Sequence, residues 1–451
     1  KNLAAELRYA RFLKSNGDFR AHAEGSGLSM YEWTGSCWNR MNDTEGKKKA
    51  WQWLIENAPK FANEKKAAAL HASSLLHLMA LPKKPVGSVI PLANYWLHVT
   101  DDNRLKIEAP NMKQGVTYHI KASIHPEQGA DYYEPQTTPE DSYFGRFLAA
   151  SLPDEDERRL VQEYCGYTLL NDVRFQKAQV WVGDGSNGKS VLLKVISELH
   201  AKVGSISLDN LSGFGLSTTV DSSLLISAET PKRGINEQEL KKIITGDPIR
   251  VEYKFKDAFT YNPTAKVLMA CNRFPQVNDD SDGVWRRLQI VRWGVNFSEA
   301  QQIRNLDEII VTQELSLVVD WCLAGLLRLL NRGGFSEPES VKLRKQYEKV
   351  NSNNVLAFIE DYGLHINTNG KMIEKEKIYR MYDEYCGANG LAGFHATEFW
   401  KRIRQVFSGI VEKKPGAGRR ARVVDLAIGE FPTEENDPNF NPFGEKEGGG
   451  K

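Results

Sequence analysis

The sequence has few of the patterns that mark disulfide-bonded, zinc-binding or membrane proteins. Its five cysteines are widely scattered without a C-x-x-C pair, and its nine histidines form no H-E-x-x-H cluster. We therefore expect a reduced, cytoplasmic protein without structural zinc. The longest apolar stretch, residues 315–330, contains Asp320 and Arg328 and is too short to span a membrane. The formal net charge is only +1, so any nucleic acid has to be bound by local basic patches.

A glycine-rich segment, Trp181-Val-Gly-Asp-Gly-Ser-Asn-Gly-Lys-Ser190, is the most informative part of the chain. It contains the pattern G-x-x-x-x-G-K-[ST], which binds the phosphates of nucleoside triphosphates. Glycines let the backbone turn tightly and direct its N–H groups at phosphate oxygens. The lysine reaches the β- and γ-phosphates, and the serine hydroxyl binds Mg²⁺. The residues predicted to bind the nucleotide are Gly183, Asp184, Gly185, Ser186, Asn187, Gly188, Lys189 and Ser190.

The residues on either side of this loop predict the context that phosphate binding requires. Residues 178–182 are typical of a strand that enters the loop, and residues 190–200 carry apolar side chains at helical spacing. The N-terminus of that helix would face the phosphates and stabilise their charge. Strand-like and helical runs alternate from about residue 151 to 340, which predicts an α/β fold.

An apolar run downstream of the loop, residues 223–229, ends in an acid, Glu229. A strand beside the phosphate-loop strand would bring this carboxylate to the γ-phosphate, to polarise the attacking water or assist Mg²⁺. Many ATPases have two adjacent acids here, but Ala228 precedes Glu229, so one carboxylate would perform both tasks. The alternative is a strand that merely ends in glutamate.

Two further motifs follow along the chain. Residues 266–272 form a strand-like run that ends in Asn272, whose amide could sense the γ-phosphate or orient water. Alternatively, Asn272 is only a turn residue before Pro275. Arg286 and Arg287 form a pair that could stabilise transition-state charge at a neighbouring subunit in a ring of ATPases. Solvation or a salt bridge is the common alternative for such a pair.

The order of these motifs resembles that of the superfamily 3 helicases, in the phage/plasmid primase–helicase and poxvirus-type branch. The residues that carry the resemblance are 183–190, 225–229, 235–240, 245–249, 256–259, 270–272 and 282–287. The resemblance implies a hexameric ring with ATP and Mg²⁺ as cofactors. It also implies translocation on single-stranded DNA and unwinding of duplex during replication of a phage, plasmid or mobile element. Many such proteins carry an upstream primase, which would fit the start at Lys1.

The resemblance also implies a role for each catalytic residue. Lys189 would bind phosphate, and Ser190 and Glu229 would hold Mg²⁺, with Glu229 as the Walker B acid. Asn272 would be the sensor. Arg286, or failing that Arg287, would be the arginine finger that acts in trans.

Two segments are predicted to contact DNA. Residues 251–256 match the family's central-channel hairpin, with Lys254, Phe255 and Lys256 at the DNA. Lysines neutralise phosphates and an aromatic ring stacks on bases, although an exposed charged strand has the same pattern. Residues 401–422 contain eight basic residues and one acid. The candidate contacts in this second segment, which could equally be a solvated loop, are Lys413, Lys414, Arg419 and Arg420.

Four domains are expected. Residues 1–150 would form an α+β N-terminal domain that acts as a collar for ring assembly, and residues 151–340 an AAA+-like P-loop ATPase core. Residues 341–428 show three helical patterns followed by a hairpin, as in a winged helix. Residues 429–451 are rich in acidic residues, proline, asparagine and glycine and are expected to be a disordered tail.

Three functions are compatible with these patterns. The first is an ATP-driven DNA helicase, and the second is a ring ATPase that remodels or loads replication proteins without unwinding DNA itself. The third is a sequence-specific initiator that uses nucleotide only as a switch. Glu229 and the Arg286–Arg287 pair favour turnover over a switch, and the Lys254–Lys256 segment favours translocation over remodelling.

Overall fold

The structure is a computed structural model, and it describes most of the chain. The described residues are 4–24, 27–208, 210–228, 235–253, 257–275, 277, 282–352, 354–367, 371–389, 391, 393–414 and 422–429. The chain divides into two compact units. One consists of Lys1–Pro275 with Asp279–Lys345, and the other of Gln276–Asn278 with Gln346–Lys451.

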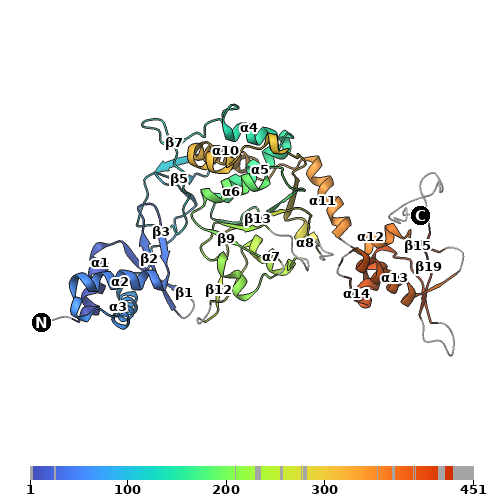
Figure 1. The fold of residues 1–451 in the computed structure, drawn as a ribbon, viewed down its shortest axis with the longest axis horizontal. Helices are drawn as coiled ribbons and strands as arrows, with labels where there is room; N and C mark the ends of the chain where they lie inside the picture. The colour runs from blue at the N-terminus through green and yellow to red at the C-terminus, as the bar shows by residue number, and fades with distance from the viewer. Residues whose placement is uncertain are drawn as a thin grey trace, which may run out of the picture. The chain divides into compact units, whose positions relative to one another are not determined.

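The first unit begins with a small antiparallel sheet and three α-helices, drawn in blue in Figure 1. The strands pair in the order β1-β2-β3. Tyr9, Trp53 and Leu70 belong to a separate core beneath this sheet. Asn42 and Glu45 form a capping box that starts α2. The elements are α1 (Ala5–Asn16), β1 (Phe19–Glu24), β2 (Gly27–Trp33), β3 (Trp38–Met41), α2 (Asp43–Asn57), η1 (Pro59–Phe61) and α3 (Glu64–His77).

A second antiparallel sheet, in the order β4-β5-β6-β7, leads into two helices. Its residues Ile90 and Leu97 belong to the same core as Trp181 and Leu192, next to the glycine-rich loop. The core around the loop therefore includes residues on both sides of position 150, where the sequence places a domain boundary. The elements are β4 (Ser88–Pro91), β5 (Trp96–Val99), β6 (Leu105–Glu108), β7 (Tyr132–Tyr133), α4 (Tyr143–Ser151) and α5 (Glu155–Thr168).

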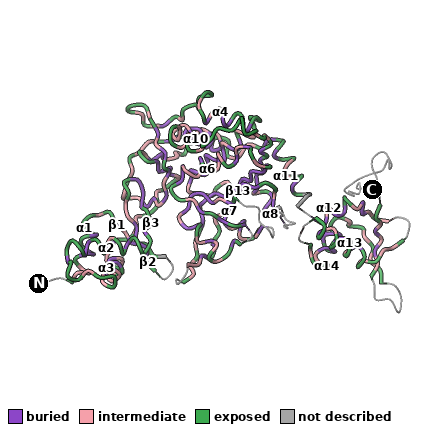
Figure 2. The backbone as a smooth tube through the Cα atoms, in the orientation of Figure 1, coloured by how far each residue is buried: buried purple, intermediate pink, exposed green. Residues whose placement is uncertain are grey.

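The centre of the first unit is a five-stranded, all-parallel sheet in the order β14-β8-β13-β10-β9. All five residues of β8 and all six of β13 are buried, as expected for strands covered on both faces (Figure 2). In Figure 1, α5, α6 and α10 gather on one side of this sheet. The strands and the helix that follows β8 are β8 (Ala178–Val182), α6 (Lys189–Leu199), β9 (Val203–Ser205), β10 (Leu224–Ser227), β13 (Lys266–Cys271) and β14 (Leu288–Arg292).

The sheet corrects one expectation. β10, the strand that leads toward Glu229, does not lie beside β8, because β13 pairs with both of them. The physical reason is that parallel neighbours are chosen by crossover packing, which sequence order does not reveal. The remaining elements of this unit are η2 (Gly213–Thr219), α7 (Glu237–Thr245), β11 (Ile249–Val251), β12 (Phe259–Tyr261), α8 (Asp282–Trp285), η3 (Glu299–Gln301), α9 (Leu306–Gln313) and α10 (Leu315–Arg332).

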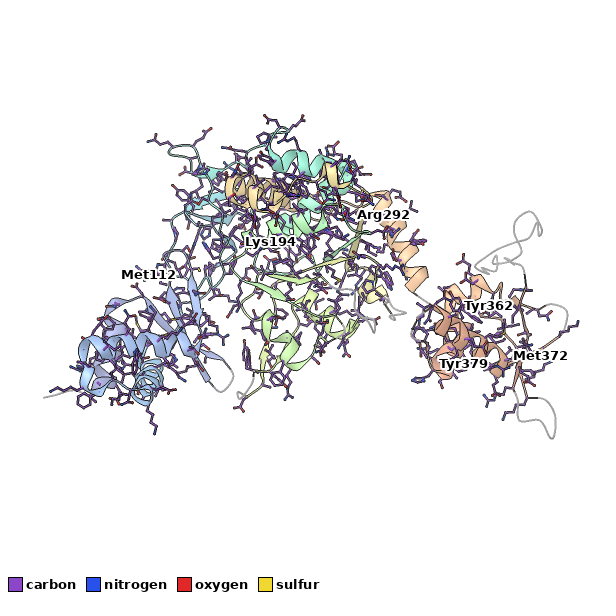
Figure 3. All side chains as sticks on the ribbon, viewed as in Figure 1. Met112, Lys194, Arg292, Tyr362, Met372 and Tyr379 are labelled. Atoms are coloured by element: carbon purple, nitrogen blue, oxygen red, sulfur yellow. The ribbon has the colours of Figure 1, made fainter. Side chains whose placement is uncertain are left out.

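The second unit is built on helices with an aromatic core. The rings of Tyr382 and Phe399 lie 4.4 Å apart, and Tyr379 packs on Phe399 at 5.6 Å (Figure 3). Two small antiparallel pairings, β15-β19 and β16-β18-β17, complete it. Its elements, with the helix that leads into it, are α11 (Glu339–Ser352), α12 (Asn354–Asp361), β15 (His365–Ile366), β16 (Ile373–Glu374), α13 (Lys375–Ala388), α14 (Ala396–Val406), β17 (Glu412–Lys413), β18 (Val423–Val424) and β19 (Leu426–Ala427).

Within the described ranges, no single helix has the length and apolar character needed to cross a membrane. The stretches Glu299–Gln313 and Leu315–Arg332 meet that test only as a pair, and they are bent by 78°.

A buried carboxylate, Glu163 on α5, joins α5 to α10. Its oxygens accept hydrogen bonds from Arg328 Nε and Arg332 Nη1, both at 2.9 Å, and from the amide and hydroxyl of Ser336 at 2.7 and 2.6 Å. Burial alone would raise the pKa of Glu163, but the hydrogen bonds from Ser336 and the two arginines outweigh it and lower the pKa below 4.5. The carboxylate therefore stabilises the fold above about pH 4.5, and this contribution is lost as the pH falls through the folded-state pKa.

Replacing Glu163 by glutamine should lower the free energy of unfolding of the first unit by about 3 kcal/mol, because two guanidinium groups lose their buried partner. The change can be measured by urea titration at pH 7. Glu155→Gln is the matched control, since Glu155 on the same helix pairs with Arg159 at the surface and should matter by less than about 1 kcal/mol. Equal losses in the two variants would contradict the assignment.

Candidate nucleotide-binding site

The glycine-rich loop connects β8 to α6, as the sequence predicts. Gly188, the residue before α6, has φ +88°, and a Cβ there would lie 2.4 Å from Ser151 Oγ on α4. A Cβ on Gly183 would lie 2.3 Å from the carbonyl oxygen of Trp293, which follows β14. The loop is therefore held between α4 and the end of the sheet, and these two positions admit only glycine.

Lys189, the first residue of α6, is buried in the loop. Its Nζ donates to the carbonyl oxygen of Gly183 at 2.6 Å and to Asn187 Oδ1 at 3.2 Å. Burial lowers the pKa of Lys189, while the nearby Cys271 and Asp184 oppose that shift. The residue before α6 is Gly188, which has no side chain to cap the helix, and the Lys189 amide donates to Asn187 Oδ1 at 3.4 Å. The N–H groups that follow at this helix N-terminus favour the binding of an anion.

A cavity of about 480 Å³ opens over this loop. Its size suits a ligand such as a nucleotide. One wall is the loop itself, from Gly185 to Val191, and the exposed Ser190 lies on it. The wall on α4 is formed by Tyr143, Arg146, Phe147, Ala150 and Ser151. The wall that follows β14 is formed by Phe297, Gln301, Gln302, Ile303 and Leu306.

The carboxyl ends of β13 and β10 contribute the fourth side of the cavity. Asn272, which follows β13, is exposed and lines it, and so does Ala228 after β10. Glu229, the next residue, lies outside the described residues. Parallel strands end at the same edge of a sheet, and this edge is the usual ligand site in open α/β folds. The loop and Asn272 therefore line the same cavity.

Arg286 and Arg287 lie at the opposite edge of the sheet, where the parallel strands begin. β14 begins with Leu288 directly opposite Ala178, the first residue of β8, and the Ala178 amide donates to the Arg287 carbonyl at 2.9 Å. The five residues of β8 separate this edge from the loop by roughly 13 Å or more. Neither arginine lines the cavity. Both arginines thus lie apart from the glycine-rich loop of their own chain.

The environments of the two arginines differ. Arg286 is exposed, and its carbonyl oxygen accepts a hydrogen bond from Lys177 Nζ at 2.5 Å. Arg287 is half-buried and donates to the carbonyl of Gly283 in α8. Burial, followed by the charge of Arg286, lowers the pKa of Arg287. Arg286 is consequently the freer of the two to reach another molecule.

The predicted DNA contacts are only partly described. Lys254, Phe255 and Lys256 lie outside the described residues, between the antiparallel strands β11 and β12. Lys413 and Lys414 are exposed, Lys413 at the end of β17, whereas Arg419 and Arg420 lie outside the described residues. Over the part of the chain that the structure describes, His, Cys, Asp and Glu side chains form no group of three or more that could hold a metal ion.

Sequence reasoning missed the walls contributed by α4 and by residues 297–306. Neither segment carries a nucleotide-binding motif, and their residue types are those of ordinary amphipathic helices and turns. Only the packing of α4 on Gly188 reveals that Phe147 and Ser151 belong to the site.

Comparison with known proteins finds similarity to a family of unknown function and to two viral proteins that are named as helicases. A model of a family of unknown function, DUF5906, matches residues 181–287. "Putative helicase L207/L206" of Acanthamoeba polyphaga mimivirus is 26% identical over 156 residues, or 32% of this chain and 16% of that protein. "Putative helicase 184R" of Invertebrate iridescent virus 6 is 24% identical over 179 residues, 36% of this chain and 18% of that protein. The matched regions thus cover less than a fifth of either relative.

Two solved structures resemble this chain at 11% and 15% sequence identity. The apo C-terminal region of NrS-1 has a TM-score of 0.48 and 11% identity, covering 93% of this chain and 99% of that chain. JCV helicase has a TM-score of 0.26 and 15% identity, covering 47% of this chain and 61% of that chain.

The contact between Gly188 and α4 predicts a graded effect of alanine in the loop. Gly188→Ala should weaken binding of a Mg²⁺–nucleoside triphosphate by roughly a hundredfold, because backbone strain and overlap with Ser151 add. Gly185→Ala, with φ +105° but nothing within 4 Å, should cost only roughly tenfold. Adding Ser151→Ala should recover part of the Gly188→Ala loss. Titration of a fluorescent nucleotide measures all three dissociation constants, and equal values for the two glycine variants would disprove the contact.

Proposed function

We propose that this chain is an ATP-dependent ring helicase of the superfamily 3 type, which translocates on single-stranded DNA during replication of a phage, plasmid or mobile element. The observation that carries the proposal is the cavity where the phosphate loop meets Asn272 at the carboxyl edge of a parallel sheet. The central region would then be an AAA+-like P-loop core. The two viral relatives support a helicase activity.

The residues around the cavity fit ATP and Mg²⁺. The uncapped N-terminus of α6 and the buried Lys189 present positive charge where phosphates would bind, and the Ser190 hydroxyl is exposed beside them. Bound MgATP supplies the phosphoryl bond whose cleavage drives the motor. Lys189 would neutralise charge on the β- and γ-phosphates, and Asn272 would orient water at the γ-phosphate. Glu229 is assigned as the carboxylate that accepts a proton from that water, as a general base, and helps to bind Mg²⁺.

The position of the arginine pair supports a site completed by a neighbouring subunit. Because Arg286 and Arg287 lie at the far edge of their own sheet, they would serve the cavity of the next subunit in a closed, head-to-tail ring. A hexamer is the expected assembly. Arg286 is the preferred finger because it is the more exposed of the two.

DNA would be held at two places. Lys254, Phe255 and Lys256 are assigned to the central channel, where repeated positive charges and stacked rings grip a single strand without sequence preference. Lys413, Lys414, Arg419 and Arg420 are assigned to the wing of a winged-helix-like domain that binds duplex. The described antiparallel pairing of β17 with β18 supports that hairpin. A primase, on a separate chain or upstream in this protein, would be the natural partner.

Strand displacement tests the proposal directly. The wild type should separate a forked duplex only with ATP and Mg²⁺, and Lys189→Ala should lower ATP turnover by about a hundredfold or more and abolish displacement. Lys194→Ala is the matched control, because Lys194 lies exposed on the same helix and pairs with Glu198 (Figure 3). Turnover without displacement, on every DNA substrate tried, would instead favour the ring ATPase that remodels replication proteins.

Mixing of inactive subunits tests the shared site. Lys189→Ala and Arg286→Ala rings should each be inactive, but mixed rings contain some interfaces with an intact loop and an intact finger. The mixture should therefore regain a measurable fraction of ATP turnover. If mixtures with Arg286→Ala and with Arg287→Ala both stay as inactive as the single variants, the pair does not act in trans.

A further inference from the structure

The hairpin formed by β11 and β12 is too short to be stable without contacts to other elements. Among the residues that the structure describes, its two three-residue strands pair with one another and lie outside the five-stranded sheet. An isolated two-stranded hairpin is at best marginally stable in water. Ile249 and Val251 are buried and fix its base, but the next residues lead directly into the segment 254–256.

An arginine from the N-terminal sheet reaches the end of this hairpin. Arg40 on β3 donates from Nη1 to Tyr253 Oη at 3.2 Å, and its guanidinium lies 5.6 Å from the centre of the Tyr253 ring. Tyr253 in turn stacks on Phe259 of β12, with centroids 5.7 Å apart. Arg40 therefore contacts the last described residue before Lys254.

A second contact ties the other strand to the same place. Asp221, which precedes β10, donates from its amide to Tyr261 Oη at 3.1 Å, and its carboxylate lies 4.0 Å from Arg40 Nε. The side chains of Arg40 and Asp221 are only 20% and 15% exposed, so water screens them weakly. We call Arg40, Asp221, Tyr253 and Tyr261 the hairpin clasp.

Arg40 is itself held firmly. Its Nη2 donates to the buried Ser29 on β2 at 3.2 Å. The N-terminal sheet is fixed to the second sheet, where Trp96 Nε1 donates to the Ser36 carbonyl at 2.8 Å. The planar guanidinium thus contacts Ser29 of the N-terminal sheet, Asp221 and Tyr253 at once, a geometry that a lysine ammonium does not reproduce.

We propose that Arg40 is a positioning residue that holds the β11–β12 hairpin in place through Tyr253, the last described residue before the segment 254–256 that the proposed function assigns to DNA. This inference rests on the proposed function. The N-terminal region then contributes to unwinding through the orientation of the hairpin, without contacting DNA or nucleotide at Arg40. Loss of the hairpin clasp leaves the nucleotide cavity intact and loosens the β11–β12 hairpin, which the proposed function assigns to DNA binding.

Hydrogen exchange on the full-length protein tests the clasp independently of DNA. Arg40→Ala and Tyr253→Phe should each speed exchange of the amides of residues 249–251 and 259–261 by roughly tenfold, because a hydrogen bond to a charged group is lost. Tyr253→Phe keeps the stacked ring and isolates the hydroxyl. Arg40→Lys should give an intermediate value. Unchanged exchange in Arg40→Ala and Tyr253→Phe overturns the inference, whether or not the wild type unwinds DNA.

A coupling measurement then tests the consequence for the motor. Arg40→Ala should retain basal ATP hydrolysis and separate several-fold fewer base pairs per ATP than the wild type. Arg20→Ala is the matched control, since Arg20 lies on β1 of the same sheet and donates to the carbonyls of Gly17 and Phe19 instead of to the hairpin. An unchanged ratio in Arg40→Ala, or the same loss in Arg20→Ala, overturns the positioning role. Absence of unwinding by the wild type refutes the proposed function and leaves the exchange result to decide the clasp.

Discussion

The parallel pairing of β8 with a neighbour on each edge is the constraint on which the rest of this structure depends. With β14 on one side and β13 on the other, the glycine-rich loop leaves the sheet one strand in from its β14 edge, next to the residue that follows β13. That residue is Asn272. The same pairing places the start of β14, and with it Arg286 and Arg287, at the opposite edge. One arrangement of strands thus gathers part of the candidate nucleotide site and keeps the arginine pair away from it.

Helices form the part of the cavity wall that the sheet does not. α4 lies against Gly188, and its first amides, those of Tyr143 and Phe144, donate to the carboxylate of Glu314 at 3.0 and 2.7 Å. Glu314 lies between α9 and α10, so the α4 wall of the cavity is attached to the start of α10. The same helix carries Arg328, which pairs with Glu163. The loop is therefore supported by a helical layer in which the buried carboxylates of Glu163 and Asp320 accept hydrogen bonds, as burial requires.

The site and the hairpin place different demands on the chain. In the proposed function, phosphate binding depends on backbone geometry within residues 183–190. DNA binding depends instead on how residues outside the β11–β12 hairpin hold it in place. The hairpin clasp links the second demand to the N-terminal sheet. In the proposed helicase, loss of the hairpin clasp would weaken binding to DNA while ATP hydrolysis continues, which separates the roles of Lys189 and Arg40 experimentally.

The sequence by itself determined the features that depend on neighbouring residues. The glycine-rich loop, the strand before it, the helix after it and the α/β character of the central region all follow from local spacing, because phosphate binding constrains consecutive residues. The helical patterns near residues 355–362, 374–385 and 397–407 correspond to α12, α13 and α14 for the same reason.

Only the tertiary structure decided which distant residues meet. The position of β13 between β8 and β10, the wall formed by Phe147 and Ser151, and the bond from Arg40 to Tyr253 join residues far apart in the chain. No local pattern encodes such contacts, because they depend on strand order and side-chain packing, which are settled by the burial of the whole core at once.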